Sequence, residues 1–207
     1  MSLFTGRDLT CIRGERRVFA HLPFSLGPGG ALLLQGANGS GKTSLLRLMA
    51  GLGRPADGRI SWNDVDIAAD FETHGARIHF VGHGDTVKPA LTARENVAFW
   101  AELRGGGDPD AGLHAFALGP LAHVPGRFLS AGQRRRVNLA RLAATQAVLW
   151  LLDEPATALD SQSVACLRDT ITRHRADGGM VALSSHGGLD IPDIVALDLS
   201  RFAVGTA

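Results

Sequence analysis

Tyrosine is absent from this chain of 207 residues, and cysteine and lysine are scarce. The two cysteines, Cys11 and Cys166, stand too far apart for a metal-binding spacing, so we expect reduced, buried thiols of a cytosolic protein. No apolar run approaches the roughly 20 residues that cross a bilayer. Arg7 and Asp8 interrupt any signal-peptide core near the start. The sequence therefore predicts that any role at a membrane depends on other polypeptides.

An excess of charge of one sign is also lacking. The formal net charge is +1, with 21 basic and 20 acidic residues, so composition gives no argument for a nucleic-acid partner or an acidic membrane face. The length and the hydrophobic content of 45% suit an ordinary globular protein, and we expect a single domain over residues 1–207.

One of the rare lysines stands in a glycine-rich segment. Only Lys42 and Lys88 are lysines, and a compact ammonium fits a tight loop better than a planar guanidinium does. The segment lies between the apolar run 31–34 and an apolar helical pattern, which is the strand, loop and helix context of a phosphate-binding loop. The predicted nucleotide-binding residues here are Gly36, Ala37, Asn38, Gly39, Ser40, Gly41, Lys42, Thr43 and Ser44.

The residue types in this segment, which we call the phosphate loop, explain the chemistry. Glycines let successive backbone N–H groups face one anion, and a helix beginning near Gly41 adds the positive end of its dipole. We expect Lys42 to be exposed in the empty loop and to reach the β- and γ-phosphates, while the Thr43 hydroxyl holds Mg²⁺. The simpler alternative is a glycine-rich turn that happens to carry Lys-Thr.

Strand and helix signals alternate along the chain. They predict strands over 3–12, 18–24, 31–34, 58–62, 77–81, 148–152, 180–184 and 194–197. They predict helices from the Thr92 cap to 101, over 111–118, over 131–144 and from the Ser161 cap to about 175, with a polar loop through Asp64 and Asp70. We therefore expect an α/β fold: a mostly parallel sheet with the phosphate loop near its middle, an N-terminal antiparallel β part, and a helical lobe inserted over about 91–144.

Two acidic residues follow a continuous apolar run. Residues 148–152 are apolar without a break, as expected of a strand covered on both faces, and Asp153 and Glu154 come next. Because ligands sit at the carboxyl ends of parallel strands, both acids should reach the edge that holds Lys42 and Thr43. We predict that Asp153 holds Mg²⁺ and that Glu154 polarises an attacking water. The alternative is a solvated acidic turn.

A basic segment about twenty residues earlier carries a second anion-binding signal. Ser130 is a good helix N-cap, and Gly132 permits close approach to an anion. The alternatives are a capped helix with a solvated basic face, or a nucleic-acid patch on Arg134, Arg135 and Arg136. Three successive arginines point around a helix and not along one side, so the patch is disfavoured.

These segments together resemble an ABC-type ATPase over nearly the whole chain. The motifs occur in the order typical of that family, namely 36–43, 129–133, 149–154, 158–160 and His186. The resemblance implies hydrolysis of ATP with Mg²⁺ by a head-to-tail homodimer. In that dimer, two ATP molecules lie between the phosphate loop of one subunit and the signature segment 129–133 of the other.

The resemblance also implies roles for individual residues. Ser130 and Gly132 would grip the γ-phosphate from the partner subunit, and Gln133 would bind the nucleotide in the same segment. Asp160 would cross the interface, and His186 would touch the γ-phosphate. A lone histidine after a strand is more often structural, and only the surrounding motifs favour the functional role of His186.

Narrower features are similar to the ATP-binding subunits of the haem exporter of bacterial cytochrome c maturation. These features are the brevity of the chain and the segments 81–83, 129–136 and 149–155. The resemblance implies a peripheral protein on the cytoplasmic face of the bacterial inner membrane, bound to separate transmembrane subunits. Its ATP use would serve haem delivery or release of a haem-loaded chaperone, so that its link to haem is indirect and it needs no nucleic acid.

Two positions depart from the wider family pattern. His83 occupies the place that usually carries glutamine, and because Mg²⁺ prefers oxygen ligands we expect it to act through a water or by contact with the γ-phosphate. The alternative is a flexible turn with a solvated imidazole. The aromatic residue that usually stacks on adenine is missing, and the matching place is near Arg13, whose planar guanidinium can stack on a base.

The same motifs leave other functions open. The chain suits the ATPase subunit of another small ABC exporter as well. A non-transport ABC switch on ribosomes or DNA would usually carry two nucleotide domains or a long coiled-coil insert, and neither occurs here. A small-molecule phosphotransferase would explain segment 36–43 but would leave 129–133 and His186 without a role.

Overall fold

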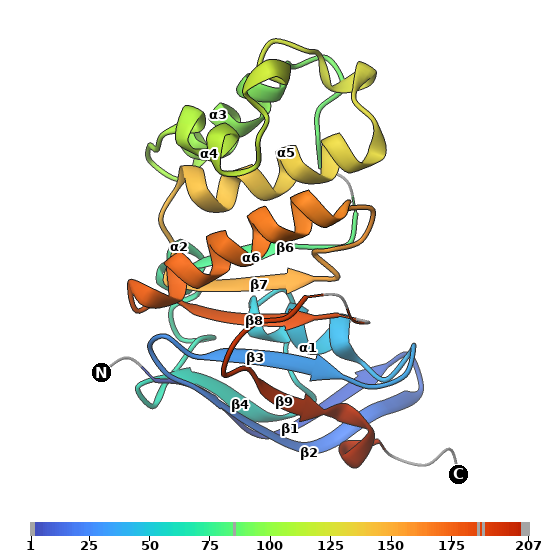
Figure 1. The fold of residues 1–207 in the computed structure, drawn as a ribbon. Helices are drawn as coiled ribbons and strands as arrows, with labels where there is room; N and C mark the ends of the chain where they lie inside the picture. The colour runs from blue at the N-terminus through green and yellow to red at the C-terminus, as the bar shows by residue number, and fades with distance from the viewer. Residues whose placement is uncertain (1–2, 85, 186, 188, 204–207) are drawn as a thin grey trace.

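Two β-sheets lie one over the other, and helices cover the free face of the larger one (Figure 1). This computed structural model describes residues 3–84, 86–185, 187 and 189–203. In that part of the chain, an antiparallel sheet has the order β2-β1-β4-β5, and a parallel sheet has the order β6-β7-β8-β3-β9. The strands are β1 (Phe4–Arg13), β2 (Arg16–Leu26), β3 (Ala31–Gln35), β4 (Asp57–Trp62), β5 (Val65–Asp66), β6 (Ile78–Val81), β7 (Leu149–Asp153), β8 (Met180–Ser184) and β9 (Val195–Asp198).

Three of the helices form a lobe at one end of the molecule (Figure 1). The α-helices are α1 (Lys42–Met49), α2 (Phe71–Arg77), α3 (Ala93–Leu103), α4 (Pro109–Ala115), α5 (Ala131–Ala144) and α6 (Ser161–Ala176), and short 3₁₀ turns are η1 (Gly119–Leu121), η2 (Gly126–Phe128) and η3 (Leu199–Phe202). The chain runs through α3, α4 and α5 between β6 and β7, and these helices stack beyond the β6 edge of the sheet (Figure 1). We call them the helical lobe.

The apolar run at β7 has the predicted cause over Leu149–Leu152, which are all buried, whereas Val148, the first residue of the predicted run, precedes the strand and is 40% exposed. Leu149 and Leu151 belong to a core that also contains side chains of α1 and the antiparallel sheet. Trp150 and Leu152 belong to a second core that contains side chains of α5 and α6. Successive side chains of a strand point to opposite faces, so the four residues of β7 that face these two cores are all apolar, and the only polar residue, Asp153, stands at the carboxyl end of the strand.

The phosphate loop lies near the middle of the sheet, as expected, but not at the central strand. The loop follows β3, which lies between the central strand β8 and the edge strand β9 and is therefore one strand from the edge. Apolar patterns show where buried strands lie in the sequence but not their order in the sheet, because the order depends on where each crossover connection returns. The acid pair follows β7, and β8 separates β7 from β3.

The polar segment after β4 is not one loop, as the sequence suggested. It holds the short strand β5 and the helix α2, whose N-cap Asp70 accepts a hydrogen bond from the Thr73 backbone N–H at 3.0 Å. His74 anchors α2 to the core: its Nδ1 accepts from the Trp62 indole at 2.9 Å, and its Nε2 lies 2.8 Å from the Met49 carbonyl oxygen. A helix of seven residues with one buried side chain shows no apolar periodicity, so the pattern missed it.

Two helix starts and one cysteine also need correction. Helix α4 begins at Pro109 and not at Ala111, because Asp108 is its cap, and Asp160 rather than Ser161 caps α6. Cys11 and Cys166 are free thiols, but only Cys11 is buried, whereas Cys166 is partly exposed. The predicted bounds of α5 and the capping box of α3 are confirmed.

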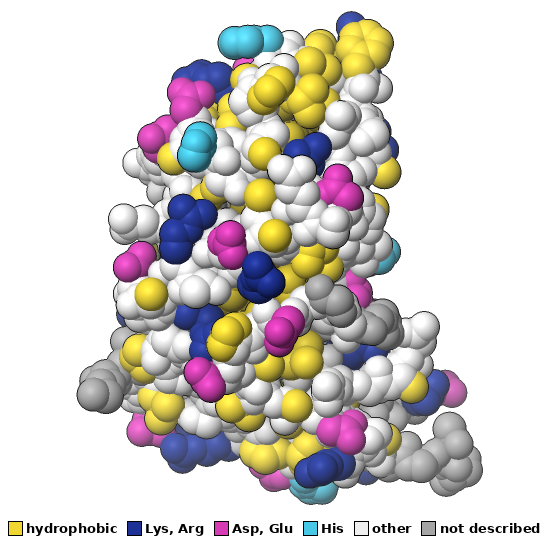
Figure 2. Space-filling view, viewed as in Figure 1, with side chains coloured by type: hydrophobic (Ala, Val, Ile, Leu, Met, Phe, Trp, Pro, Cys, Tyr) yellow, Lys and Arg dark blue, Asp and Glu magenta, His cyan; other side chains and the backbone are white. Residues whose placement is uncertain are grey.

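Basic and acidic side chains are interspersed over the face of the molecule seen in Figure 2. Apolar side chains gather at the end formed by the helical lobe. Within the described part of the chain, none of the helices combines the length and the apolar character needed to cross a membrane.

His79, on β6, predicts how stability depends on pH. Burial, and then the nearby Arg104 and Arg141, lower the pKa of His79 to about 3, and its Nε2 lies 2.6 Å from the Thr145 hydroxyl. On acidification below the ordinary histidine pKa of about 6.5, the unfolded chain takes up a proton that the folded chain refuses. We therefore expect His79 to lower the free energy of unfolding by about 1.4 kcal/mol for each pH unit of acidification between about pH 6 and 4.

Denaturant unfolding at pH 7.5 and pH 5 measures this effect. The variant His79→Gln has no such group, so its stability should depend less on pH than that of the parent, by about 2 kcal/mol over this interval. Equal pH dependence in the two proteins would contradict the assignment.

Candidate functional site

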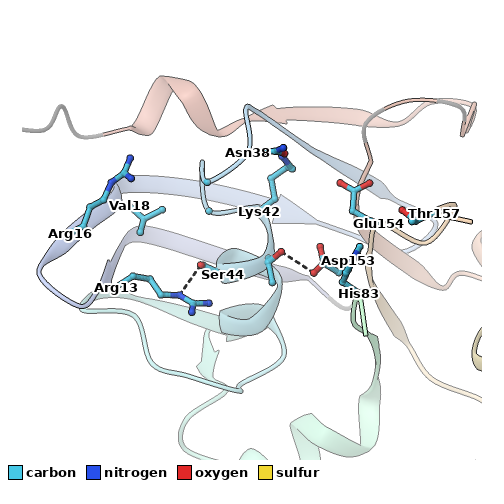
Figure 3. Close-up of a pocket in the computed structure, with 13 residues that line it drawn as sticks. Arg13, Arg16, Val18, Asn38, Lys42, Ser44, His83, Asp153, Glu154 and Thr157 are labelled. Carbon is cyan, nitrogen blue, oxygen red and sulfur yellow. Dashed lines mark hydrogen bonds between the residues drawn. The ribbon is translucent and has the colours of Figure 1, made fainter. Parts of the chain in front are cut away.

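A cavity of about 570 Å³ opens where the phosphate loop, the end of β7 and the β1–β2 hairpin meet (Figure 3). Its lining joins segments far apart in the sequence, as expected at the carboxyl ends of parallel strands. The lining residues are Arg13, Arg16, Val18, Asn38, Gly39, Gly41, Lys42, Thr43, Ser44, His83, Asp153, Glu154 and Thr157.

The phosphate loop connects β3 directly to α1, as the sequence predicted. Gly41 precedes the first helical residue with φ +102°, and a Cβ at that position would lie 2.7 Å from a Val18 methyl carbon, so only glycine fits. The first turn of α1 contains no acidic residue. The backbone N–H groups and dipole at this helix end therefore favour an anion.

Lys42 is not exposed in the empty loop, contrary to expectation. The residue is only 8% exposed, and its ammonium donates hydrogen bonds to the carbonyl oxygens of Gly36, at 2.7 Å, and Ala37, at 3.2 Å. A buried ammonium requires such partners because burial without them is costly. The loop therefore holds the ammonium on its own carbonyls, and a phosphate has to compete for it.

Asp153 lies at the centre of a polar network beside the loop. It is 2% exposed, so the alternative of a solvated acidic turn does not hold for this residue. Its Oδ2 accepts from the Thr43 hydroxyl at 2.9 Å, and its Oδ1 accepts from the Ser184 hydroxyl at 2.7 Å. These are oxygen donors of the kind that Mg²⁺ prefers, so the residues present fit the metal that the sequence predicts.

Glu154 lines the cavity next to Asp153 (Figure 3). Its backbone N–H donates to the Ser184 hydroxyl at 2.9 Å, and its φ of +49° lies in the left-handed region. For a residue other than glycine this conformation costs about 1–2 kcal/mol, so the surrounding contacts hold it in place. The left-handed residue ends β7 and turns the chain toward α6.

The far end of the cavity is basic and was only partly anticipated. Arg13 lines it, as predicted, and its Nε donates to the Ser44 hydroxyl at 3.2 Å. Arg16, Val18 and Thr157 also line the cavity and were missed. The hairpin from β1 to β2 brings Arg16 opposite Arg13, which a strand prediction without a pairing register could not reveal.

Two predicted histidines have different outcomes. His83 follows β6, is exposed, and lines the cavity near Glu154 and Thr157 (Figure 3). The structure thus brings it to the acid pair, as the hypothesis of a role at the γ-phosphate requires. His186 lies outside the described residues.

The signature segment forms the capped start of α5. The Ser130 hydroxyl accepts from the Gln133 backbone N–H at 3.2 Å, and the Gln133 side chain accepts from the Ser130 N–H at 2.8 Å. Gly132 packs against the loop after Glu154, where an added Cβ would meet the Ala158 carbonyl oxygen at 2.8 Å. None of Ser130, Gly132, Gln133 and Asp160, all within the described chain, lines the cavity of their own subunit.

The three arginines of α5 do not form a basic patch. Arg134 donates to the Leu129 carbonyl oxygen at 2.6 Å, and Arg136 donates to the Phe116 carbonyl oxygen at 3.2 Å. Arg135 is buried against the turn that contains Glu154. The side chains thus leave the helix in different directions, as the helical period predicts.

The fold and the site define a phosphate-loop nucleotide hydrolase of the ABC type. The family described as "ABC transporter" matches residues 19–157. The chain is 60% identical over 204 residues to the cytochrome c biogenesis ATP-binding export protein CcmA of Rhodospirillum rubrum, covering 98% of this chain and 88% of that protein. The chain therefore belongs to the ABC transporter family, and within it to the cytochrome c biogenesis ATP-binding export proteins.

Further comparisons agree. The protein of the same name from Paramagnetospirillum magneticum is 53% identical over 209 residues, covering 98% of this chain and 96% of that one. A solved bacterial Atm1-family ABC exporter with ATP bound has a TM-score of 0.80 and 25% identity, over 95% of this chain and 37% of that one. The predicted fold class and ABC-type ATPase are confirmed, with ATP as the nucleotide. A phosphotransferase is excluded by the family.

Proposed function

We propose that this chain hydrolyses ATP to drive the haem exporter of cytochrome c maturation, as a single nucleotide-binding domain over 1–207 with a helical lobe at about 91–144. The main support is the meeting of Lys42, Thr43, Asp153 and Glu154 at one cavity that could admit the phosphates of ATP. The names of the relatives, which include cytochrome c biogenesis and export, support the pathway.

The phosphate loop residues 36–44 bind the phosphates of ATP in this proposal. Lys42 leaves the carbonyl oxygens of Gly36 and Ala37 and takes phosphate oxygens in their place, which exchanges neutral acceptors for charged ones. Thr43 and Asp153 would hold Mg²⁺, which when bound neutralises charge on the β- and γ-phosphates. At the other end of the cavity, the Arg13 guanidinium offers a planar surface for the base.

Glu154 acts as the general base. A water attacks the γ-phosphorus as its proton passes to the Glu154 carboxylate, and the bond from phosphorus to the ADP oxygen breaks. The backbone contacts of Glu154 orient its carboxylate, and the exposed His83 contacts the γ-phosphate or a water beside it. His186 is proposed, from the motif alone, to touch the same phosphate.

A head-to-tail homodimer completes each site. Ser130 and Gly132, with Gln133, belong to the capped N-terminus of α5, which carries no acidic residue in its first turn and so favours an anion. Because these residues do not line their own cavity, a γ-phosphate would reach them in a partner subunit. Asp160 follows on the loop that packs against Gly132 and crosses the interface.

Mixing two inactive variants tests this arrangement. Ser130→Arg should disable the partner's site and Lys42→Ala its own, so a mixed dimer holds both defects in one site and leaves the other intact. An equal mixture should recover roughly a quarter of the parental ATP turnover, because about half of the dimers are mixed. Each variant alone is the control. If the mixture is no more active than either variant, the sites are not shared head-to-tail.

The membrane partners are tested separately. We expect the tagged chain to co-purify from native membranes with separate transmembrane subunits, at the cytoplasmic face of the inner membrane, and those subunits to bind haem or a haem-loaded chaperone. Recovery of transmembrane subunits that serve another cargo would favour a different small ABC exporter. Recovery with ribosomes or DNA would favour a non-transport ABC switch.

A further inference from the structure

The helical lobe contacts the edge of the parallel sheet through a row of arginines. Among the described strands, β6 lies at the edge of the sheet, and no described strand pairs with the carbonyl groups on its outer side. Arg104 donates to the carbonyl oxygen of Ile78 at 2.8 Å, Arg141 to that of Phe80, and Arg135 to that of Gly82 at 2.9 Å. Alternate carbonyls of the edge are thus each held by one arginine of the lobe.

Arg135 differs from Arg104 and Arg141 because it also binds the turn formed by residues 153–155, which we call the catalytic turn. Its Nη2 donates to the carbonyl oxygens of Asp153, at 3.0 Å, and Glu154, at 2.8 Å, and its Nε donates to that of Pro155 at 3.3 Å. The residue is only 8% exposed. One guanidinium therefore joins the signature helix, the segment before His83 and the turn that carries the acid pair.

The conformation of Glu154 makes this contact possible. Carbonyls of consecutive residues in an extended strand point in opposite directions, so three in a row cannot face one group. The left-handed φ of +49° at Glu154 bends the chain until the carbonyls of 153, 154 and 155 surround the guanidinium. The same guanidinium therefore stabilises the unusual backbone that aims the Glu154 side chain.

We propose that Arg135 is a positioning residue for hydrolysis: it holds the Glu154 turn at a fixed place relative to the start of α5. Ser130 lies five residues before Arg135 in the capped end of the same helix, so a displacement of that end is passed to the turn through Arg135. The signature segment and Glu154, the general base, thus move as a unit in each subunit. The inference rests on the proposed ATP hydrolysis.

The first test compares Arg135→Ala with a matched control, Arg104→Ala. Arg104 also donates to several carbonyl oxygens between the lobe and the sheet, those of Ala76, Ile78 and Gln146, but it does not touch the catalytic turn. Steady-state ATP turnover and thermal unfolding are measured on the full chain. We expect Arg135→Ala to lower kcat roughly 10–100-fold with KM for ATP changed less than about twofold, and Arg104→Ala to retain kcat. An equal effect of both variants on kcat would overturn the proposal.

A conservative variant and a double variant test whether the loss of kcat in Arg135→Ala comes only from a less stable fold. Arg135→Lys keeps the charge and up to three donors but cannot span both segments, so its kcat should be intermediate. In the Glu154→Gln background, single-turnover cleavage of ATP should be slowed less than about twofold by Arg135→Ala, because Arg135 acts through Glu154. If Arg135→Ala slows that background as much as it slows the parent, Arg135 does not act through Glu154.

The outcomes also separate this inference from the proposed function. If Glu154→Gln and Lys42→Ala retain parental turnover, the site is not the one proposed. If those two variants are inactive while Arg135→Ala behaves like Arg104→Ala, only the role of Arg135 is wrong.

Discussion

Replacing Glu154 with glutamine should slow ATP hydrolysis by about 10²–10⁴-fold while ATP binding is retained. The amide has the shape of the carboxyl group but cannot accept the proton of the attacking water. Because the left-handed backbone at Glu154 is held by the Ser184 hydroxyl and by Arg135, the side chain should be the only part that changes. ATP-bound subunits that cannot hydrolyse should accumulate as a dimer, which gel filtration with and without ATP would detect.

Glu102→Gln is the matched control for this variant. Glu102 is an exposed residue of α3, and the same loss of one charge there should leave turnover and dimerisation unchanged. A Glu154→Gln protein that hydrolyses ATP at the parental rate would show that another group, with His83 as the first candidate on the cavity wall, receives the proton.

Lys42→Ala should raise the dissociation constant for ATP by roughly 10–100-fold or more. A charge-assisted contact to phosphate contributes roughly 1.5–3 kcal/mol, and several phosphate oxygens share this ammonium. Isothermal titration of the full chain with ATP measures the loss. Lys88→Ala removes the only other lysine, whose ammonium lies 4.4 Å from the centre of the Phe99 ring and away from the cavity, and should bind ATP like the parent.

The burial of Lys42 adds a consequence for stability. Without the ammonium, the carbonyl oxygens of Gly36 and Ala37 lose their donor, which is expected to cost about 1–3 kcal/mol unless water replaces it. The thermal unfolding temperature of Lys42→Ala should therefore be slightly lower than that of the parent, with the fold retained. If Lys42→Ala binds ATP with the parental affinity in the titration, the assignment of the phosphate loop to the ATP site is wrong.

Several features followed from short stretches of sequence because their causes are local. The phosphate loop needs glycines next to Lys42 and Thr43, and the spacing is visible in the chain itself. The capping box at Thr92 and the N-cap at Ser130 each join residues three positions apart, and both formed as predicted; at Ser130 the Gln133 side chain completes a capping box that was not predicted. The apolar run of β7 shows burial on two faces without any knowledge of the neighbours.

The expectations that failed or were incomplete depend on the path of the backbone, which side-chain patterns do not specify. The position of β3 one strand from the edge depends on crossovers, and the burial of Lys42 depends on how the loop folds back on its own carbonyls. Arg16 enters the site only through the pairing of β1 with β2. The partners of Lys42 and Arg16 lie only a few positions away in the sequence, but the contacts run through backbone carbonyls and strand pairing, which no pattern of side chains marks.

The sequence by itself determined that this protein has a phosphate loop, an acid pair after a buried strand and a capped signature helix, and hence its family. Only the tertiary structure decided how these parts are joined. Arg135 illustrates the difference, because in sequence it is one arginine of three. Its partners are carbonyl groups, which every residue possesses, so no side-chain pattern marks them, and the left-handed backbone at Glu154 that gathers them appears only when the chain is folded.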